Sequence, residues 1–137
     1  MSIKKLAIDD DYAMTELLTL LLETHGFEMV TAHSGGEGIS MIRTLSPNVV
    51  ILDLMMPDLD GWQVCTAVRK FSSVPILVLS ALDSPGLVTS ALDAGADYYL
   101  AKPVPCEVLI AYVNKLTHRP EMYDKKGLKL QSAPFLV

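Results

Sequence analysis

The stretch VVILDLMMPDLDG, residues 49–61, decides the fold of this chain. It begins with four consecutive apolar residues, at 49–52, which is typical of a strand buried on both faces. Asp53 follows directly, and the turn-forming residues at 57–61 end the segment before the next apolar stripe. A buried strand that ends on a carboxylate indicates a parallel sheet with polar side chains at one edge.

Other apolar runs of this kind occur at residues 6–8 and 76–79, with weaker strand patterns at 29–30 and 98–100. Between these runs, apolar residues recur at helical spacing. The helical stripes fall at residues 14–22, 38–45, 64–71, 88–92 and 108–116. Strand and helix therefore alternate five times, which predicts an α/β fold with a parallel sheet, right-handed crossovers and helices on both faces.

The chain has 137 residues, a formal net charge of −5 and 50% hydrophobic residues. This length suits one domain, and the apolar fraction excludes a wholly disordered chain. The acidic balance argues against a general nucleic-acid binder, because phosphate contacts need clustered Lys and Arg. The cysteines, Cys65 and Cys106, form neither a disulfide framework nor a zinc motif. No apolar run suits a signal peptide or a membrane span, so we expect a soluble, cytoplasmic protein.

Chemically active residues follow the predicted strands at the edge where a parallel sheet binds ligands. Asp9 and Asp10 follow the first strand, Asp53 the third, Ser80 the fourth and Lys102 the fifth. Neighbouring carboxylates repel one another unless a cation lies among them, and Mg²⁺ suits such oxygen ligands. The lone lysine then indicates an anionic ligand. A carboxylate, Mg²⁺, a lysine and a hydroxyl together predict a site that accepts a phosphoryl group.

With these motifs the sequence resembles the receiver domain of two-component response regulators, a family that includes the chemotaxis regulators. The matching segments are residues 6–11, 50–61, 78–81 and 95–103. They lie in order at the ends of successive predicted strands and cover about residues 3–117. The resemblance implies a flavodoxin-like, doubly wound sheet of five parallel strands in the order 2-1-3-4-5.

The resemblance also implies a role for each acidic residue. Asp53 is expected to accept a phosphoryl group from the phosphohistidine of a sensor histidine kinase or phosphotransfer protein. Asp10 and Asp53 are expected to bind Mg²⁺ directly, together with the backbone carbonyl of Met55. Asp9 is expected to act largely through water. The implied function is a phosphorylation-dependent signalling switch that changes its own binding surface.

Three further positions complete the implied machinery. Lys102 is expected to neutralise the phosphoryl group or the resting carboxylate, and the bond from Lys102 to Pro103 is expected to be cis. Ser80 is expected to bond a phosphoryl oxygen, and Tyr99 to swing inward when it does. Tyr98 lies on the opposite face of the strand by alternation. The resemblance implies that the chain is not an enzyme, apart from its own phosphotransfer and its own dephosphorylation.

The domain prediction divides the chain at residue 118. Residues 1–118 are expected to form the receiver domain, and residues 119–137 a tail or linker. The strand pattern at 128–131 is compatible with the start of a truncated effector domain, through which DNA could be bound. The alternative is a tail that docks on its own domain. We expect no membrane contact and no direct nucleic-acid binding by this domain.

A homodimer is expected through the face made by the fourth helix, the fifth strand and the fifth helix. The regulators with a winged-helix effector favour an acidic residue at Tyr98 and an arginine near Ala111 or Tyr112, so this chain departs from their pattern at that face.

Several alternatives remain at the level of sequence. A phosphatase with an aspartyl nucleophile would need a second Asp two residues after Asp53, where this chain has Met55. A degenerate receiver that binds partners without being phosphorylated is the alternative function. Among single residues, Asp11 is expected to cap a helix. The remaining expectations are that Asp58 and Asp60 shape the turn and the start of the next helix, that Cys65 is core, and that His25, His33 and His118 are solvated.

Overall fold

Five parallel strands form one sheet in the order β2-β1-β3-β4-β5 in the computed structural model, which describes residues 4–118. The strands are β1 (Lys4–Ile8), β2 (Glu28–Ala32), β3 (Val49–Leu52), β4 (Ile76–Ser80) and β5 (Tyr98–Ala101). The predicted fold class and strand order are therefore confirmed.

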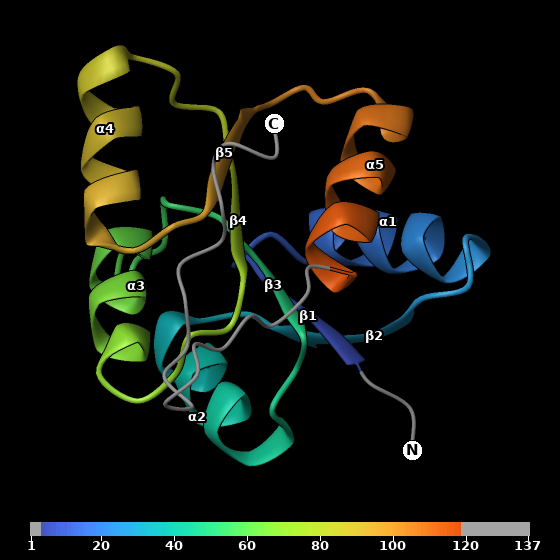
Figure 1. Ribbon diagram of the computed structural model, residues 1–137, viewed down its shortest axis with the longest axis horizontal. Coiled ribbons are helices and arrows are strands. Elements are labelled where there is room, and N and C mark those ends of the chain that lie inside the picture. Colours follow the sequence, from blue (N-terminus) through green and yellow to red (C-terminus); the bar gives the residue numbers. More distant parts are fainter. Residues whose placement is uncertain (1–3, 119–137) are drawn as a thin grey trace, which may run out of the picture.

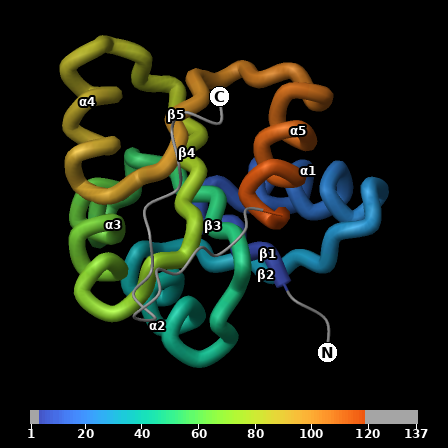
Figure 2. The backbone as a smooth tube through the Cα atoms, viewed as in Figure 1, coloured from blue at the N-terminus to red at the C-terminus, as the bar shows by residue number. Residues whose placement is uncertain are grey.

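Five helices alternate with the strands and cover both faces of the sheet. They are α1 (Tyr12–Thr24), α2 (Gly35–Leu45), α3 (Gly61–Arg69), α4 (Pro85–Ala94) and α5 (Cys106–Thr117). Figure 1 shows α1 and α5 together on one face and α2, α3 and α4 on the other. The alternation of strand and helix can be followed along the tube in Figure 2. The helical stripe that reaches Phe71 in the sequence ends earlier in the structure, because α3 stops at Arg69.

The strand β3 shows why the central strands have no polar positions. Its four residues are all buried, and alternate side chains join different clusters. Val50 and Leu52 pack with the cluster under α2 to α4, whereas Val49 and Ile51 pack with the cluster under α1 and α5. Both faces of this strand are therefore covered, as the continuous apolar run predicts.

Polar side chains fix where the helices begin. Asp11 caps α1 by accepting from the N–H groups of Ala13 and Met14, so the cap predicted for this residue is confirmed. Asp60 caps α3 within a reciprocal capping box with Gln63. These caps place the first turns of α1 and α3 immediately after the strand ends that carry the acidic residues.

Two glycines let helices approach the sheet where other residues would clash. A Cβ at Gly38 in α2 would lie 2.4 Å from Cδ1 of Ile8. A Cβ at Gly61, the first residue of α3, would lie 2.7 Å from the backbone Cα of Leu54 and 2.9 Å from the carbonyl oxygen of Asp53. The loop after Asp53 is therefore held tightly against the start of α3.

Some predictions fall outside what the structure describes. The strand pattern at 128–131 and the tail 119–137 lie beyond residues 4–118, so the division of the chain at residue 118 stays a prediction. Within residues 4–118, no helix has the length and apolar character needed to cross a membrane.

Candidate functional site

The predicted site residues meet at the carboxyl edge of the sheet. The N–H of Asp53 donates to the carbonyl of Ile8 at 3.0 Å, which joins the end of β3 to the end of β1. The N–H of Lys102 donates to the carbonyl of Ser80 at 2.8 Å, which joins the end of β5 to that of β4. Here the strand order changes direction, since β1 lies between β2 and β3, and open α/β sheets bind ligands at such a point.

Three carboxylates gather at this edge. One oxygen each from Asp9, Asp10 and Asp53 lies within 4.8 Å of the others. Asp9 is buried, with 3% of its surface exposed, whereas Asp10 is exposed and Asp53 is half-buried. The donors are all hard oxygens, which is the chemistry that Mg²⁺ requires. The residues present therefore fit a divalent cation, as the sequence predicts.

The lysine lies against the same cluster. The Nζ of Lys102 donates to Oδ2 of Asp9 at 3.2 Å, so its nearest ion pair is with Asp9. The peptide bond between Lys102 and Pro103 is cis, which confirms the expectation from the family. The ammonium thus lies within the acidic cluster, where it offsets part of the negative charge.

The surroundings of Asp53 act on its acidity in opposite directions. Burial raises the pKa of the Asp53 carboxyl, and the negative charge of Asp9 raises it further. The positive charge of Lys102 and the N–H groups of Met55 and Leu54 lower this pKa. Burial prevails, so the pKa of Asp53 lies above its ordinary value. A cation in the cluster would favour the ionised, nucleophilic form of this carboxylate.

Ser80 and Tyr99 converge on a single loop residue. Ser80 is fully buried at the end of β4, and its Oγ accepts from the N–H of Leu82 at 3.2 Å. The hydroxyl of Tyr99 donates to the carbonyl of Leu82. Tyr99 packs with the cluster under α2 to α4, and Tyr98 with the opposite one, which confirms the predicted alternation. The roles of Ser80 and Tyr99 in switching stay predictions.

Met55 combines a predicted backbone role with an exposed side chain. Its side chain is 59% exposed and lines a groove of about 460 Å³. Leu82 and Trp62 line the same groove, which borders the loop after Asp53. The expected contribution of the Met55 carbonyl to a metal stays a prediction.

Asp58 connects two helices in a way that its sequence context does not reveal. Its oxygens accept from the N–H groups of Gly35 and Gly36, at 3.0 Å each, at the start of α2. The sequence predicts a role for this residue only in the turn and in the start of the next helix, and not at the start of α2. The partners lie more than twenty positions away, and only the fold brings them together.

The prediction that His33 is simply solvated is wrong. Its ring is half-buried and stacks on the Tyr12 ring, with centroids 3.7 Å apart, and its Nε2 lies 3.0 Å from the Thr15 hydroxyl. The reason is that the loop after β2 lies against the first turn of α1. Cys65, in contrast, is fully buried, so its assignment to the core is confirmed.

An apolar groove of about 490 Å³ separates α1 from α5 beside the acidic site. Its walls come from α1, from the end of β4 and from the segment between β5 and α5: Met14, Leu17, Leu18, Leu21, Leu79, Ala81, Lys102, Pro103, Val104, Cys106 and Leu109. Leu17, part of an apolar stripe in the sequence, is 53% exposed rather than core. Helical spacing alone predicts that the apolar stripe at residues 14–22 is buried. It does not predict that a groove runs along the stripe.

Comparison with known proteins gives consistent matches over the same region. The family model described as response regulator receiver domain matches residues 6–114. Response regulator MprA of Mycobacterium ulcerans is 42% identical over 128 residues, which is 93% of this chain and 55% of that protein. The chain therefore spans about half the length of this curated relative.

Solved structures agree in fold. The receiver domain of a Francisella response regulator superposes with a TM-score of 0.81 and is 35% identical, covering 86% of this chain and 98% of that one. A two-component response regulator from Clostridium difficile superposes with a TM-score of 0.82 and is 30% identical, with the same two coverages.

The acidic edge of the sheet, the family match and the fold agree with one another. Over the matched residues, this chain belongs to the response regulator receiver domains of two-component systems, the family whose function is a phosphorylation-dependent switch.

Proposed function

We propose that Asp53 of this chain accepts a phosphoryl group from the phosphohistidine of a sensor histidine kinase or phosphotransfer protein. The observation that carries this proposal is the arrangement of Asp9, Asp10 and Asp53 within 4.8 Å, with the Lys102 ammonium 3.2 Å from Asp9. Such a site holds a nucleophilic carboxylate and also the positive charge that an incoming phosphoryl group needs.

Asp10 and Asp53 would hold Mg²⁺ together with the Met55 carbonyl, and Asp9 would act through water. When bound, Mg²⁺ supplies charge neutralisation for the phosphoryl oxygens. The side chains present fit this ion, because they offer oxygens at one sheet edge beside a single ammonium.

In the proposed step, a carboxylate oxygen of Asp53 attacks phosphorus in line with the phosphorus–nitrogen bond of the donor. The new oxygen–phosphorus bond forms as the imidazole leaves with the electron pair of the old bond and takes up a proton. Lys102 exchanges its contact with Asp9 for one to a phosphoryl oxygen, and the Ser80 hydroxyl donates to another. Water later cleaves the acyl phosphate, so the chain catalyses only its own modification and its reversal.

The donor protein must bring its histidine to this edge, and the groove between α1 and α5 supports docking there. Lys102 contributes to both the groove and the acidic site, and the exposed Leu17 lines the groove on α1. We assign this groove to the kinase or phosphotransfer protein, because Lys102 lines the groove and also pairs with Asp9 in the acidic cluster.

The remaining proposals concern the rest of the protein. Residues 1–118 are assigned to the receiver domain and residues 119–137 to a linker that leads to an effector domain, which would bind any DNA target. The match covers only 55% of the curated relative, which supports this division. The output surface is assigned to α4, β5 and α5 as a homodimer face, and the site of action to the cytoplasm.

The test is to treat the protein with acetyl phosphate and to measure the mass of the intact protein. The parent protein should gain one phosphoryl group when Mg²⁺ is present, and Asp53→Asn should gain none, because an amide does not attack phosphorus. Asp10→Asn should take up much less of the phosphoryl group, and the uptake that remains should no longer depend on Mg²⁺. Asp11→Asn is the matched control, since Asp11 caps α1 and its carboxylate is not in the cluster.

Two outcomes would contradict the proposal. A parent protein that takes up no phosphoryl group while it still binds a kinase would favour the degenerate receiver. A phosphoryl adduct on Asp53→Asn would place the acceptor on another residue.

A further inference from the structure

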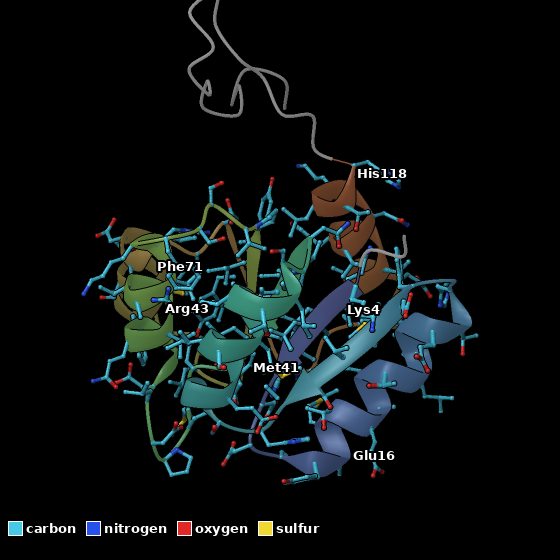
Figure 3. The ribbon with its side chains drawn as sticks, turned by 90° about the horizontal axis from the view of Figure 1, so that it is seen from below. Lys4, Glu16, Met41, Arg43, Phe71 and His118 are labelled. Carbon is cyan, nitrogen blue, oxygen red and sulfur yellow. The ribbon has the colours of Figure 1, made fainter. Side chains whose placement is uncertain are left out.

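Another groove, of about 390 Å³, lies between α1 and β2. It shares no lining residue with the groove between α1 and α5, so it opens on a different side of α1. Figure 3 labels Glu16 on α1 and shows β2 alongside this helix. The stacked rings of Tyr12 and His33 line the groove where α1 begins. We call this surface the α1–β2 groove, and the proposed phosphoryl transfer makes no use of it.

The wall contributed by α1 combines negative charge with an exposed apolar residue. Glu16, Leu20 and Glu23 lie on one side of the helix, because they are spaced four and three positions apart. Leu20 is 68% exposed, and both glutamates are exposed. Within residues 4–118, neither glutamate takes part in an ion pair. This helix face therefore offers two free carboxylates on either side of an exposed leucine.

The other wall comes from the edge of the sheet. β2 is the first strand in the sheet order and, among the described strands, it pairs with β1 alone. The N–H of Asp9 donates to the carbonyl of Ala32, so the backbone polar groups of Ala32 point toward β1. In a parallel pair, successive residues point these groups to opposite sides, so those of Thr31 point away from β1. Since Thr31 also lines the groove, an open strand edge borders the glutamates.

The charge of this surface selects its occupant. In a symmetric pair of chains joined at this edge, the carboxylates of both copies would come together, and the formal net charge of −5 opposes such pairing. A basic segment has the complementary charge. The hydrocarbon stem of a lysine or arginine covers an exposed leucine while its charged end reaches a carboxylate. An extended backbone also satisfies the open N–H and C=O groups of a strand edge.

We propose that the α1–β2 groove binds an extended basic segment of a partner protein. The segment adds to the sheet beside β2, with backbone hydrogen bonds at Thr31, and its lysine or arginine side chains pair with Glu16 and Glu23. The proposal concerns a surface apart from Asp53 and does not depend on phosphoryl transfer.

The probe that tests the charge pairing is a fluorescent peptide of about eight residues, within the usual length of a strand, in which lysine and threonine alternate. Fluorescence anisotropy of the peptide with the full chain measures its affinity. The matched peptide of glutamate and threonine should bind at least about tenfold more weakly, because its charges repel the groove. Glu16→Gln and Glu23→Gln should each weaken the lysine peptide about threefold, the loss expected for one exposed ion pair. Rising salt should weaken it as well.

A second arm tests the backbone contact. Thr31→Pro removes an N–H that points away from β1, a change that an edge strand accepts, and it should weaken the lysine peptide about tenfold. A lysine peptide that is N-methylated at alternate residues should lose affinity to a similar degree for the parent chain, and this comparison leaves the protein unchanged. Glu107→Gln, at an exposed position on α5, is the control and should keep the affinity within about twofold.

Amide chemical shifts of the labelled chain locate the bound peptide. The signals of Leu20 and Thr31 should move on titration, whereas those of Asp10 and Asp53 should not. Movement at Asp10 and Asp53 alone would place the peptide at the acidic site and overturn the proposal.

Four other results would also overturn it. One is a lysine peptide that does not bind the parent chain, and another is unchanged affinity in both Glu16→Gln and Glu23→Gln. Equal binding of the N-methylated peptide would show that no strand is added. Self-association of the parent chain without peptide, if Thr31→Pro abolishes it, would assign this edge to a second copy.

Discussion

At the scale of single residues, Asp58 shows how a loop carboxylate can organise a distant helix. Its two oxygens accept from the N–H groups of Gly35 and Gly36, which have no partner within α2. These hydrogen bonds hold the pKa of the Asp58 carboxyl below its ordinary value. A charged carboxylate is also favoured at the positive end of a helix. The same loop begins at Asp53, so this contact steadies the loop that follows Asp53.

The depressed pKa of Asp58 predicts a pH-dependent contribution to stability. Because the folded state favours the ionised form, the stabilisation is present above the unfolded pKa of about 4 and is lost as pH falls through the lower folded value. Asp58→Asn should therefore be less stable than the parent by about 0.5 kcal/mol at pH 7, and this difference should close as the pH falls below the folded pKa. Urea unfolding over a series of pH values from neutral to acid measures this. Asp83→Asn, at an exposed position, is the control, and a gap that persists in acid would refute the argument.

Met55 and Leu82 predict a slow loss of the phosphoryl group. Both line the groove beside the loop after Asp53, and neither has a polar group that orients water for in-line attack. The double change Met55→Asn with Leu82→Glu should speed phosphate release by about tenfold or more, which corresponds to a barrier lower by about 1.4 kcal/mol. Phosphate release under matched Mg²⁺ is the measurement, with Leu45→Asn on α2 as the control. Equal rates would mean that other groups set the lifetime.

At the scale of elements, Arg69 joins the ends of α3 and α4 to the starts of β4 and β5. Its guanidinium donates to the carbonyls of Gly95 and Val74 and pairs with Asp97 at 3.1 Å. The C-cap of α4, Gly95, has a φ of 123°, a conformation that favours glycine. A planar group with several donors at fixed angles is needed to reach all of these acceptors.

This geometry predicts that Arg69→Lys is destabilising although the charge is kept. A lysine ammonium cannot donate in the same fork, so buried carbonyls lose their partners, and we expect a loss of about 2–3 kcal/mol. Urea unfolding followed by circular dichroism measures it. Lys70→Ala, at the adjacent exposed position, should change stability by less than about 0.5 kcal/mol. A loss below 1 kcal/mol for Arg69→Lys would show that water replaces the guanidinium.

At the scale of the whole molecule, the loop after β4 connects the candidate site with α4 and β5. In this loop, the N–H of Leu82 donates to the Ser80 hydroxyl oxygen, and the carbonyl of Leu82 accepts from the Tyr99 hydroxyl. We predict that a movement of the Ser80 hydroxyl toward a phosphoryl oxygen would release one of the two hydrogen bonds that hold the loop. The residues expected to respond belong to the face made by α4, β5 and α5, where Tyr98 packs edge-on against Tyr112.

This connection predicts where hydrogen exchange changes when beryllofluoride, a mimic of the phosphoryl group, is bound. In the parent, exchange should change in α4 and β5, whereas α2 should exchange as before. Ser80→Ala should remove most of the response, because the methyl group offers no hydrogen bond to the mimic. Ser90→Ala, at an exposed position in α4, is the control. A full response in Ser80→Ala would assign the connection to another residue.

The sequence by itself determined the fold class and most of the candidate site. Continuous apolar runs require strands buried on both faces, and a parallel sheet brings its carboxyl ends to one edge, so Asp9, Asp10, Asp53, Ser80 and Lys102 had to be neighbours. Capping follows rules that span only three or four residues, which is why Asp11 and Asp60 could be assigned in advance. The order of the strands could be predicted only from the resemblance to a family.

Only the tertiary structure decided the contacts between residues far apart in sequence. The pairing of Lys102 with Asp9, the stacking of His33 on Tyr12, and the exposure of Leu17 depend on where separate elements pack. The same holds for the burial of Lys5, which lies just outside the strand predicted at residues 6–8. Periodicity states which face of an element is apolar, but burial and charge pairing are set by the neighbour across that face, and the neighbour is known only when the chain has folded.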